Sequence, residues 1–180
     1  MSKIIDPGAA FRQLFSEFEH TAFRLEVRNA YAVERERKYL DRFLAGAPED
    51  VSWLAGWFDT VRTATEAGRR FMRVRVVDLP LSDYSRFGYV HARYNNDAGE
   101  DIRYLHREAA RDVGLPNHDY WLFDSRRLLR MNFDDEDRLL NCEFDEDPIE
   151  IVRHNYWRDV AWHHAVKRDE FVTEEQLGRA

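Results

Sequence analysis

The sequence predicts an α/β fold in which a mixed β-sheet is flanked by helices. Two kinds of segment alternate along the chain. Some have the 3.6-residue period of amphipathic helices, and others are short and have a period of two, which is typical of half-buried strands. Three consecutive strand-like segments between residues 120 and 144 then indicate a meander, so antiparallel pairing joins the alternating pattern. We therefore expect one mixed sheet with helices packed against it.

Residues 1–50 are expected to form a helix, a strand and a second helix. Asp6 and Pro7 are residue types favoured at a helix N-terminus, and an apolar stripe follows at helical spacing. That stripe comprises Phe11, Leu14, Phe15 and Phe18. A strand is expected over residues 23–28, where apolar and charged residues alternate, and a helix over Val33–Ala45. We interpret residues 1–50 as an N-terminal extension packed on the core.

Residues 51–170 are expected to form the α/β core. The first expected elements are a helix from Ser52 to Gly68, a strand over Phe71–Val77, a helix or irregular segment after Ser82, a turn at Asn95–Gly99, a strand over Ile102–Leu105 and a short helix ended by Gly114. Tyr120–Asp124 is the expected central strand, because both of its faces are apolar. Strands over Leu128–Phe133 and Leu139–Phe144 complete the meander.

A C-terminal helix is expected to begin at Asp147 and Pro148, which suit the N-cap and the first turn. Its apolar stripe would comprise Ile149, Val152, Tyr156 and Val160. The polar tail, residues 171–180, is expected to fray.

The composition limits the classes of function. With 180 residues, 44% of them hydrophobic, the chain can build one well-packed core. No apolar run reaches the roughly 18 residues of a membrane span and no signal peptide is evident, so we expect a soluble, cytoplasmic protein without a membrane partner. Cys142 is the only cysteine and is expected to be buried. The net charge is −7 and no basic face is evident, which argues against direct binding of duplex DNA.

The segment from His118 to Asp124 resembles part of a phospholipase-D-like domain. The catalytic residues of such domains are spaced H-x-K-x-x-x-x-D, but here Tyr120 stands in place of the lysine and Asp124 falls one residue short. The resemblance covers about residues 52–165 and implies a phospholipase-D-like half-domain without the catalytic motif. Since such halves often pair, it also favours a homodimer.

Several side chains are candidates for ligand binding, and none for catalysis. Arg73 and Arg75 lie two residues apart on one strand, so they share a face and can grip a carboxylate or phosphate, with Arg103 as a third positive group. Alternatively, they form salt bridges on an exposed face. Either His118 and Asp124 line a pocket together at a strand end, or His118 is a turn residue that enters the strand and forms a hydrogen bond with the backbone or with Asp124.

Two further groups of residues leave alternatives open. Trp157 and Trp162 are five residues apart and cannot share one narrow helical stripe, so one packs on the sheet and the other, with Trp162 as our candidate, covers a pocket or interface. His154, His163 and His164 are expected at the surface, and they lack the i, i+4 spacing of a helical metal site. We therefore expect no metal and no cofactor.

Several phrases of the chain resemble an actinobacterial family of uncharacterised domains. The most specific phrases are residues 18–26, 73–77, 98–103 and 118–124. Members are often encoded beside helix-turn-helix regulators, so the resemblance implies a role near transcriptional regulation or secondary metabolism.

The sequence therefore favours a non-catalytic regulatory domain that binds a ligand or protein. The expected partners are an anionic small molecule or a helix-turn-helix regulator. The alternative is an enzyme of a biosynthetic or nucleotide pathway, with an undescribed site around His118 and Arg75.

Overall fold

The structure is a computed structural model, and it describes residues 2–171 of the chain. One eight-stranded sheet forms its centre, with strands in the order β1-β7-β6-β5-β2-β3-β4-β8. The strands are β1 (Lys3–Ile5), β2 (Thr21–Glu26), β3 (Arg70–Val77), β4 (Asp101–His106), β5 (Tyr120–Phe123), β6 (Arg127–Phe133), β7 (Leu139–Asp145) and β8 (Val166–Lys167). The sheet is mixed, because β2, β3 and β4 run parallel while the other pairs are antiparallel. The predicted α/β class is thus confirmed.

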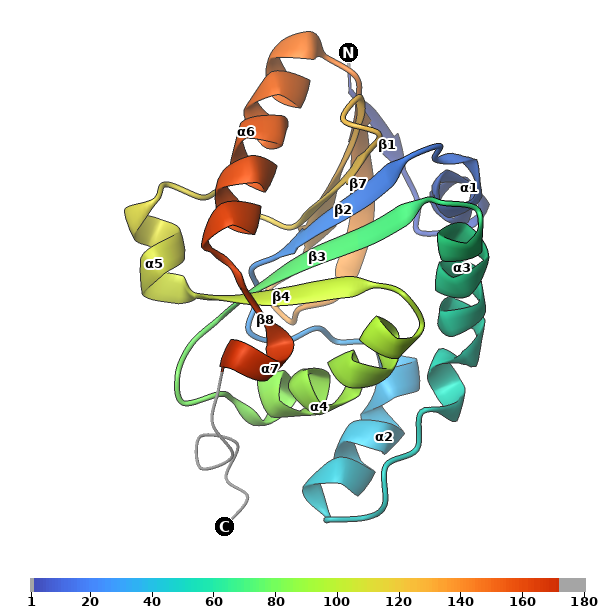
Figure 1. Cartoon of the computed structure of the whole chain (residues 1–180), viewed down its shortest axis with the longest axis vertical. Coiled ribbons are helices and arrows are strands. Elements are labelled where there is room, and N and C mark those ends of the chain that lie inside the picture. Colours follow the sequence, from blue (N-terminus) through green and yellow to red (C-terminus); the bar gives the residue numbers. More distant parts are fainter. Residues whose placement is uncertain (1, 172–180) are drawn as a thin grey trace.

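Helices cover both faces of this sheet (Figure 1). They are α1 (Ala9–Glu17), α2 (Glu34–Leu44), α3 (Ala55–Glu66), α4 (Asp83–Asp97), α5 (Arg107–Asp112), α6 (Pro148–His164) and α7 (Arg168–Phe171), with a 3₁₀ turn at Ser52–Leu54. Helices α1 and α3 pack on one face in a cluster that includes Phe15, Phe71 and Trp121. Helices α5 and α6 pack on the opposite face over Phe23, Leu25 and Leu122. Among the described helices, none is long and apolar enough to cross a membrane.

Strand β2 lies inside the sheet, between β5 and β3. Residues 1–50, which we expected to be an extension packed on the core, therefore supply an interior strand, and β1 adds an edge strand against β7. The division at residue 50 has no counterpart in the sheet. The apolar stripe of α1 covers the sheet of its own domain, since Leu14, Phe15 and Phe18 are buried there.

Local signals located most helix ends. Asp147 accepts hydrogen bonds from the backbone N–H groups of Ile149 and Glu150, as expected of the N-cap of α6. Ser82 caps α4 in the same way through the N–H of Ser85. Helix α1 differs, because its N-cap is Gly8, and Asp6 makes no side-chain cap there.

The turn expected at Asn95–Gly99 is mostly helix. Helix α4 ends at Asp97, with Ala98 as its C-cap. Gly99 follows with a φ of +111°, which is accessible mainly to glycine. The side chain of Asn96 accepts a hydrogen bond from the N–H of Ile102, so this asparagine joins the helix end to β4 rather than breaking the helix.

The stripe predicted for α6 faces away from the sheet. Ile149, Val152 and Tyr156 are 70%, 69% and 61% exposed. The buried face instead presents His154 and Ala161, with Trp162 packed against it. The prediction was wrong because it was based on the spacing of apolar residues alone. The helix packs on the rings of Phe23 and Tyr120, where the small side chain of Ala161 and the rings of His154 and Trp162 fit. The tail expected to fray lies, after Phe171, outside the described residues.

Candidate functional site

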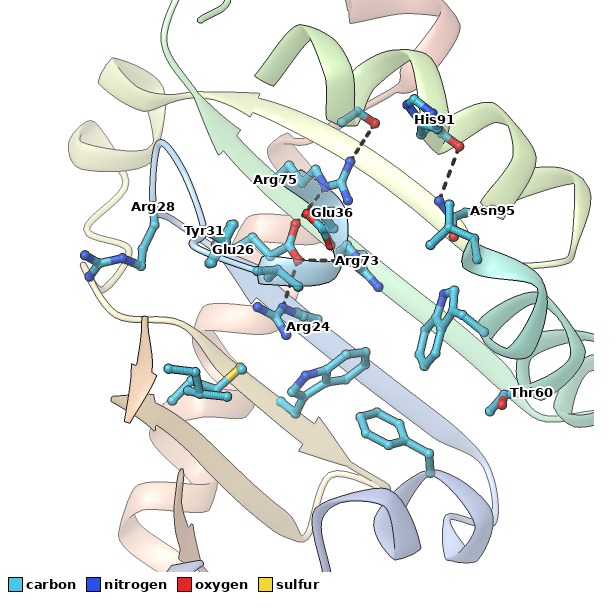
Figure 2. A pocket seen from close by; sticks show the side chains of 18 of the residues that line it. Arg24, Glu26, Arg28, Tyr31, Glu36, Thr60, Arg73, Arg75, His91 and Asn95 are labelled. Atoms are coloured by element: carbon cyan, nitrogen blue, oxygen red, sulfur yellow. Dashed lines mark hydrogen bonds and ion pairs between the residues drawn. The ribbon is translucent and has the colours of Figure 1, made fainter. Parts of the chain in front are cut away.

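A buried network of arginines and carboxylates lies on the face of the sheet that carries α1 and α3. Figure 2 shows Arg24, Arg73 and Arg75 converging on Glu26. Glu26 Oε1 accepts a hydrogen bond from Arg73 Nη1 at 2.8 Å, and Glu26 Oε2 accepts one from Arg75 Nε at 2.6 Å. Arg24 Nε lies 3.0 Å from Glu26 Oε1, without the alignment of a hydrogen bond. One carboxylate thus binds three guanidinium groups from two parallel strands.

The electrostatics keep this network ionised. Burial alone would raise the pKa of Glu26, but the positive charges of Arg73, Arg75 and Arg24 outweigh it and lower that pKa well below its ordinary value. Burial would likewise lower the pKa of Arg24, but Glu26 and Asp119 raise it. The carboxylate and its arginines are therefore charged at neutral pH.

Two more carboxylates complete the charge balance. Asp119 accepts hydrogen bonds from Arg24 Nη2 at 3.2 Å, from the hydroxyl of Tyr31 at 2.6 Å and from the N–H of Val27 at 2.9 Å. Glu100 accepts hydrogen bonds from Arg73 Nε at 2.7 Å and from Trp57 Nε1 at 3.0 Å. Three arginines therefore face three carboxylates.

The position of β2 explains why this network is buried. Phe23, Leu25 and Val27 point to the α6 face, so the alternating residues Arg24 and Glu26 point to the opposite face. Helices α1 and α3 pack on one face of the sheet at β2 and helices α5 and α6 on the other, so both faces of the strand are covered and charged side chains there must be paired.

Glycine at position 88 lets Arg75 reach helix α4. Arg75 Nη1 donates a hydrogen bond to the carbonyl of Gly88 at 2.8 Å and lies 3.3 Å from the hydroxyl of Tyr104. A Cβ atom at position 88 would lie only 3.1 Å from Arg75 Nη1. A glycine within a helix costs about 1 kcal/mol relative to alanine, and here it gives the guanidinium room to approach the backbone.

A pocket of about 910 Å³ opens beside this network, between α4, α3 and α2. Its lining contains seven arginines, namely Arg12, Arg24, Arg28, Arg35, Arg69, Arg73 and Arg75, but only three acidic residues, namely Glu26, Glu36 and Asp59. The ten phenylalanine, tyrosine and tryptophan residues of the lining are Phe11, Phe15, Tyr31, Trp53, Trp57, Tyr84, Phe87, Tyr104, Trp121 and Phe133. The pocket is therefore aromatic and rich in arginine, although the chain carries a net charge of −7.

Glu36 is a titratable group on the α2 side of this pocket. Its Oε2 accepts a hydrogen bond from the hydroxyl of Tyr84 at 2.9 Å. Burial raises the pKa of Glu36, and the hydrogen bond from Tyr84 offsets only part of that effect. The carboxyl group of Glu36 therefore accepts a proton more readily than that of Glu26, whose pKa is lowered.

Two of the six candidate residues, Arg73 and Arg75, line this pocket. They share a face of β3 as expected, but they are half-buried and already bind Glu26. The alternative was a solvent-exposed strand face covered by salt bridges. The salt bridges are present, but the face is not exposed to solvent.

Arg103 and Trp162 contact each other on the opposite face of the sheet. Arg103 Cζ lies 3.8 Å from the ring centroid of Trp162, and its Nη2 pairs with Asp101 at 3.1 Å. Arg103 cannot join Arg73 and Arg75, because residues at odd positions of β4 point to the α6 face while Tyr104 points toward Arg75.

His118 contacts helix α6 rather than Asp124. The two Nε2 atoms of His118 and His154 are 3.2 Å apart, and Trp157 packs against both rings. His154 is fully buried, which corrects the expectation of a surface histidine. Its Nδ1 lies 2.8 Å from the carbonyl of Glu150, so Nδ1–H donates and Nε2 accepts from His118. Burial, and then the charge of His154, lower the pKa of His118 to about 4.

Asp124 holds the turn after β5. Its carboxylate accepts hydrogen bonds from the backbone N–H groups of Glu19, His20 and Thr21, and it pairs with Arg127. Asp124 and His118 thus lie at opposite ends of β5 and do not form one pocket. Within residues 2–171, no group of three histidine, cysteine or acidic side chains is arranged to hold a metal ion.

A family model describes nearly the whole chain. Residues 9–173 match a domain of unknown function, DUF6879. The chain belongs to this family. The match begins in α1 and so spans the division that we expected at residue 50. No curated protein matches the chain.

Solved structures are similar to this one in fold. NucT from Helicobacter pylori aligns with a TM-score of 0.53 at 10% identity, covering 93% of this chain and 98% of NucT. Nuc from Salmonella typhimurium, a phospholipase D family member, aligns with a TM-score of 0.49 at 10% identity, covering 93% of this chain and 95% of Nuc. The likeness to NucT, over nearly the whole chain, shows that the two proteins share this mixed α/β fold, which is the fold class that we predicted.

Sequence reasoning missed most of the network. Glu26, Arg24 and Asp119 were absent from the candidates, although Asp119 is the neighbour of His118 and Arg24 alternates with apolar residues. The missed signal was the alternation of charged and apolar residues over residues 24–28. Once both faces of the strand are known to be covered, this alternation indicates a row of buried charged side chains that pair with one another.

Proposed function

We propose that this protein is a non-catalytic ligand-binding domain that takes a small anionic molecule with a flat aromatic body. The pocket lining carries this proposal, since seven arginines and ten aromatic rings surround a cavity of about 910 Å³ in an acidic protein. Pockets of roughly 300–1,000 Å³ with apolar walls and few polar groups are typical of small-molecule sites.

The charges of the lining favour an anion. The network arginines are balanced by Glu26, Asp119 and Glu100, and Arg28 pairs with Asp137. Arg12, Arg35 and Arg69 form ion pairs with none of the described carboxylates. These three guanidinium groups leave the pocket wall with a positive surplus.

The aromatic rings favour a planar ligand. Trp53 lies nearly parallel to Phe87 at 6.1 Å, with an interplanar angle of 9°, and Trp57 packs edge-on against Phe15 and Phe71. Rings held in this way offer rigid faces for stacking at little entropic cost.

A matched pair of variants tests the proposal. Aromatic carboxylates and phosphates would be screened by thermal shift, and hits would be titrated calorimetrically. Arg35→Gln removes a charge from the pocket wall and should weaken binding about 3–10-fold, whereas Arg37→Gln, two residues further along α2 and outside the lining of this pocket, should not. Equal affinities for both variants, or no binding by any anion of the screen, would overturn the proposal.

The alternative of an enzyme requires a different site from the one first considered. His118 and Arg75 lie on opposite faces of the sheet, so they do not act on one substrate. Glu36 is the pocket acid whose pKa is raised, and it would be the residue to substitute if turnover of a bound compound were seen.

The regulatory role belongs to the same proposal. Resemblance to domains encoded beside helix-turn-helix regulators supports a cytoplasmic actinobacterial protein that reports a ligand to such a regulator, alone or as a homodimer. Pull-down with the tagged protein, with and without a ligand from the screen, should recover a DNA-binding protein in a ligand-dependent amount. Identical recovery in both conditions would refute ligand control.

A further inference from the structure

The pocket has a second polar end on helix α4. Tyr84, Phe87, Gly88, His91 and Asn95 occupy positions i, i+3, i+4, i+7 and i+11, so one face of the helix lines the pocket. Figure 2 shows His91 and Asn95 on this helix, beside Arg75 and Arg73. His91 and Asn95 are 5% and 6% exposed, so they are almost enclosed.

His91 presents a hydrogen-bond acceptor. Its Nδ1 lies 2.8 Å from the carbonyl of Phe87, which accepts a proton only, so Nδ1 carries the hydrogen and Nε2 carries the lone pair. Burial lowers the pKa of His91, which keeps the ring neutral at pH 7. The ring is held in place by Phe87, with centroids 4.2 Å apart, and by Trp53.

Asn95 presents a second acceptor. Its Nδ2 donates to the carbonyl of His91 at 3.3 Å, which leaves the side-chain oxygen for another donor. Among residues 2–171, neither His91 Nε2 nor Asn95 Oδ1 has a hydrogen-bond partner, and neither is sealed from solvent. The pocket lining therefore contains two hydrogen-bond acceptors without a protein donor, on side chains that are almost fully buried.

Hydrogen-bond donors lie about one helical turn from His91. Arg75 donates a hydrogen bond to the carbonyl of Gly88 through Nη1, while its Nη2 has no partner among the described residues. Donors on the sheet and acceptors on α4 thus border the same aromatic cavity.

From this arrangement we propose, on the basis of the proposed function, that the ligand is an aromatic acid that also carries an N–H or O–H donor. Its acidic group faces the arginines, and its amino or hydroxyl group donates to His91 Nε2 and Asn95 Oδ1. A site built to bond such a donor rejects the analogue that lacks it, because the acceptors then stay unpaired.

The test compares matched probes. The amino and hydroxyl isomers of 2-naphthoate would be titrated against the full-length protein beside unsubstituted 2-naphthoate. At least one donor-bearing isomer should bind five-fold or more tightly than 2-naphthoate. His91→Phe, which keeps a ring of similar shape but has no acceptor, should abolish this preference, so that the donor-bearing isomer and 2-naphthoate bind with similar affinity. His91→Gln, which retains an acceptor, should keep part of it.

The outcomes separate the two proposals. If 2-naphthoate binds as well as every substituted isomer, or if the preference survives in His91→Phe, the acceptor end is not used and this inference fails while the binding site stands. If no naphthoate binds to the wild-type protein while another anion of the screen does, this inference fails and the binding site stands; if no anion of the screen binds, both fail. Near-UV circular dichroism confirms the fold of each variant, and Asn95→Leu provides the same comparison at the second acceptor should His91→Phe not fold.

Discussion

Replacing Glu26 by glutamine should leave three buried arginines without their shared carboxylate. Removing one partner of a buried ion pair costs about 3–5 kcal/mol, whereas an exposed pair contributes about 0–1 kcal/mol. The side chain of Glu26 is 9% exposed and those of Arg24, Arg73 and Arg75 are 10%, 12% and 20% exposed. Since water screens these partners only partly, we expect Glu26→Gln to lower the free energy of unfolding by about 3 kcal/mol.

Urea denaturation at pH 7 measures this loss. Glu136→Gln is the control, because Glu136 also binds an arginine, Arg138, but is 71% exposed and should cost less than about 0.5 kcal/mol. Sulfate should restore part of the stability of Glu26→Gln by binding the freed guanidinium groups, and should leave the control unaffected. A loss below about 1 kcal/mol, or no response to sulfate, would show that the network is not the buried cluster described.

The same substitution has a predicted pH dependence. The pKa of Glu26 is lowered in the folded protein, so its contribution is fully present above the unfolded pKa of about 4.3 and is lost as the pH falls through the lower folded value. The stability difference between wild type and Glu26→Gln should therefore be constant from pH 5 to 8, at about the same 3 kcal/mol, and shrink in stronger acid.

Three further predictions concern sites outside the network. Because the pKa of His118 is lowered to about 4, wild-type stability should fall as the pH drops from the ordinary histidine value of about 6.5 toward 4, and His118→Gln should reduce that fall by about 1–3 kcal/mol in urea titrations; parallel curves would contradict it. Asp124→Ala removes the acceptor of three backbone N–H groups and should cost about 1–3 kcal/mol by urea denaturation, more than Asp124→Asn, so equal stabilities would argue against this role. Burial raises the pKa of Cys142 to about 11, so a thiol reagent should modify it only after unfolding; rapid labelling of the native protein would be inconsistent with its position.

Periodicity and capping residues predicted most elements because these signals are local. The cap at Asp147, the strand over Tyr120–Phe123 and the following meander all depend on residues within one segment. The shared face of Arg73 and Arg75 followed from the two-residue period of a strand in the same way.

Strand order was beyond this reasoning because it depends on contacts distant in the sequence. Residues 24–28 have the pattern of a strand with one solvent-exposed face, and only the packing of the distant helix α3, with α1, on that face reveals that both faces are covered. Glu26 and Asp119 were overlooked for this reason. The apolar stripe of α6 was assigned to the buried side of the helix, but it faces solvent. The side that packs on the sheet carries His154 and Ala161 instead of branched aliphatic residues.

The interior place of β2 has a consequence for how the chain acquires its fold during synthesis. Phe23 in β2 pairs with Leu122 in β5, so β2 waits for almost one hundred further residues before this second neighbour in the sheet is synthesised. At about 5–20 residues per second, that delay is roughly 5–20 s. Until then Arg24 lacks Asp119 and Trp121, and the pocket lacks the part of its lining that comes from the meander. A nascent chain stalled before residue 120 should consequently lack a protease-resistant core.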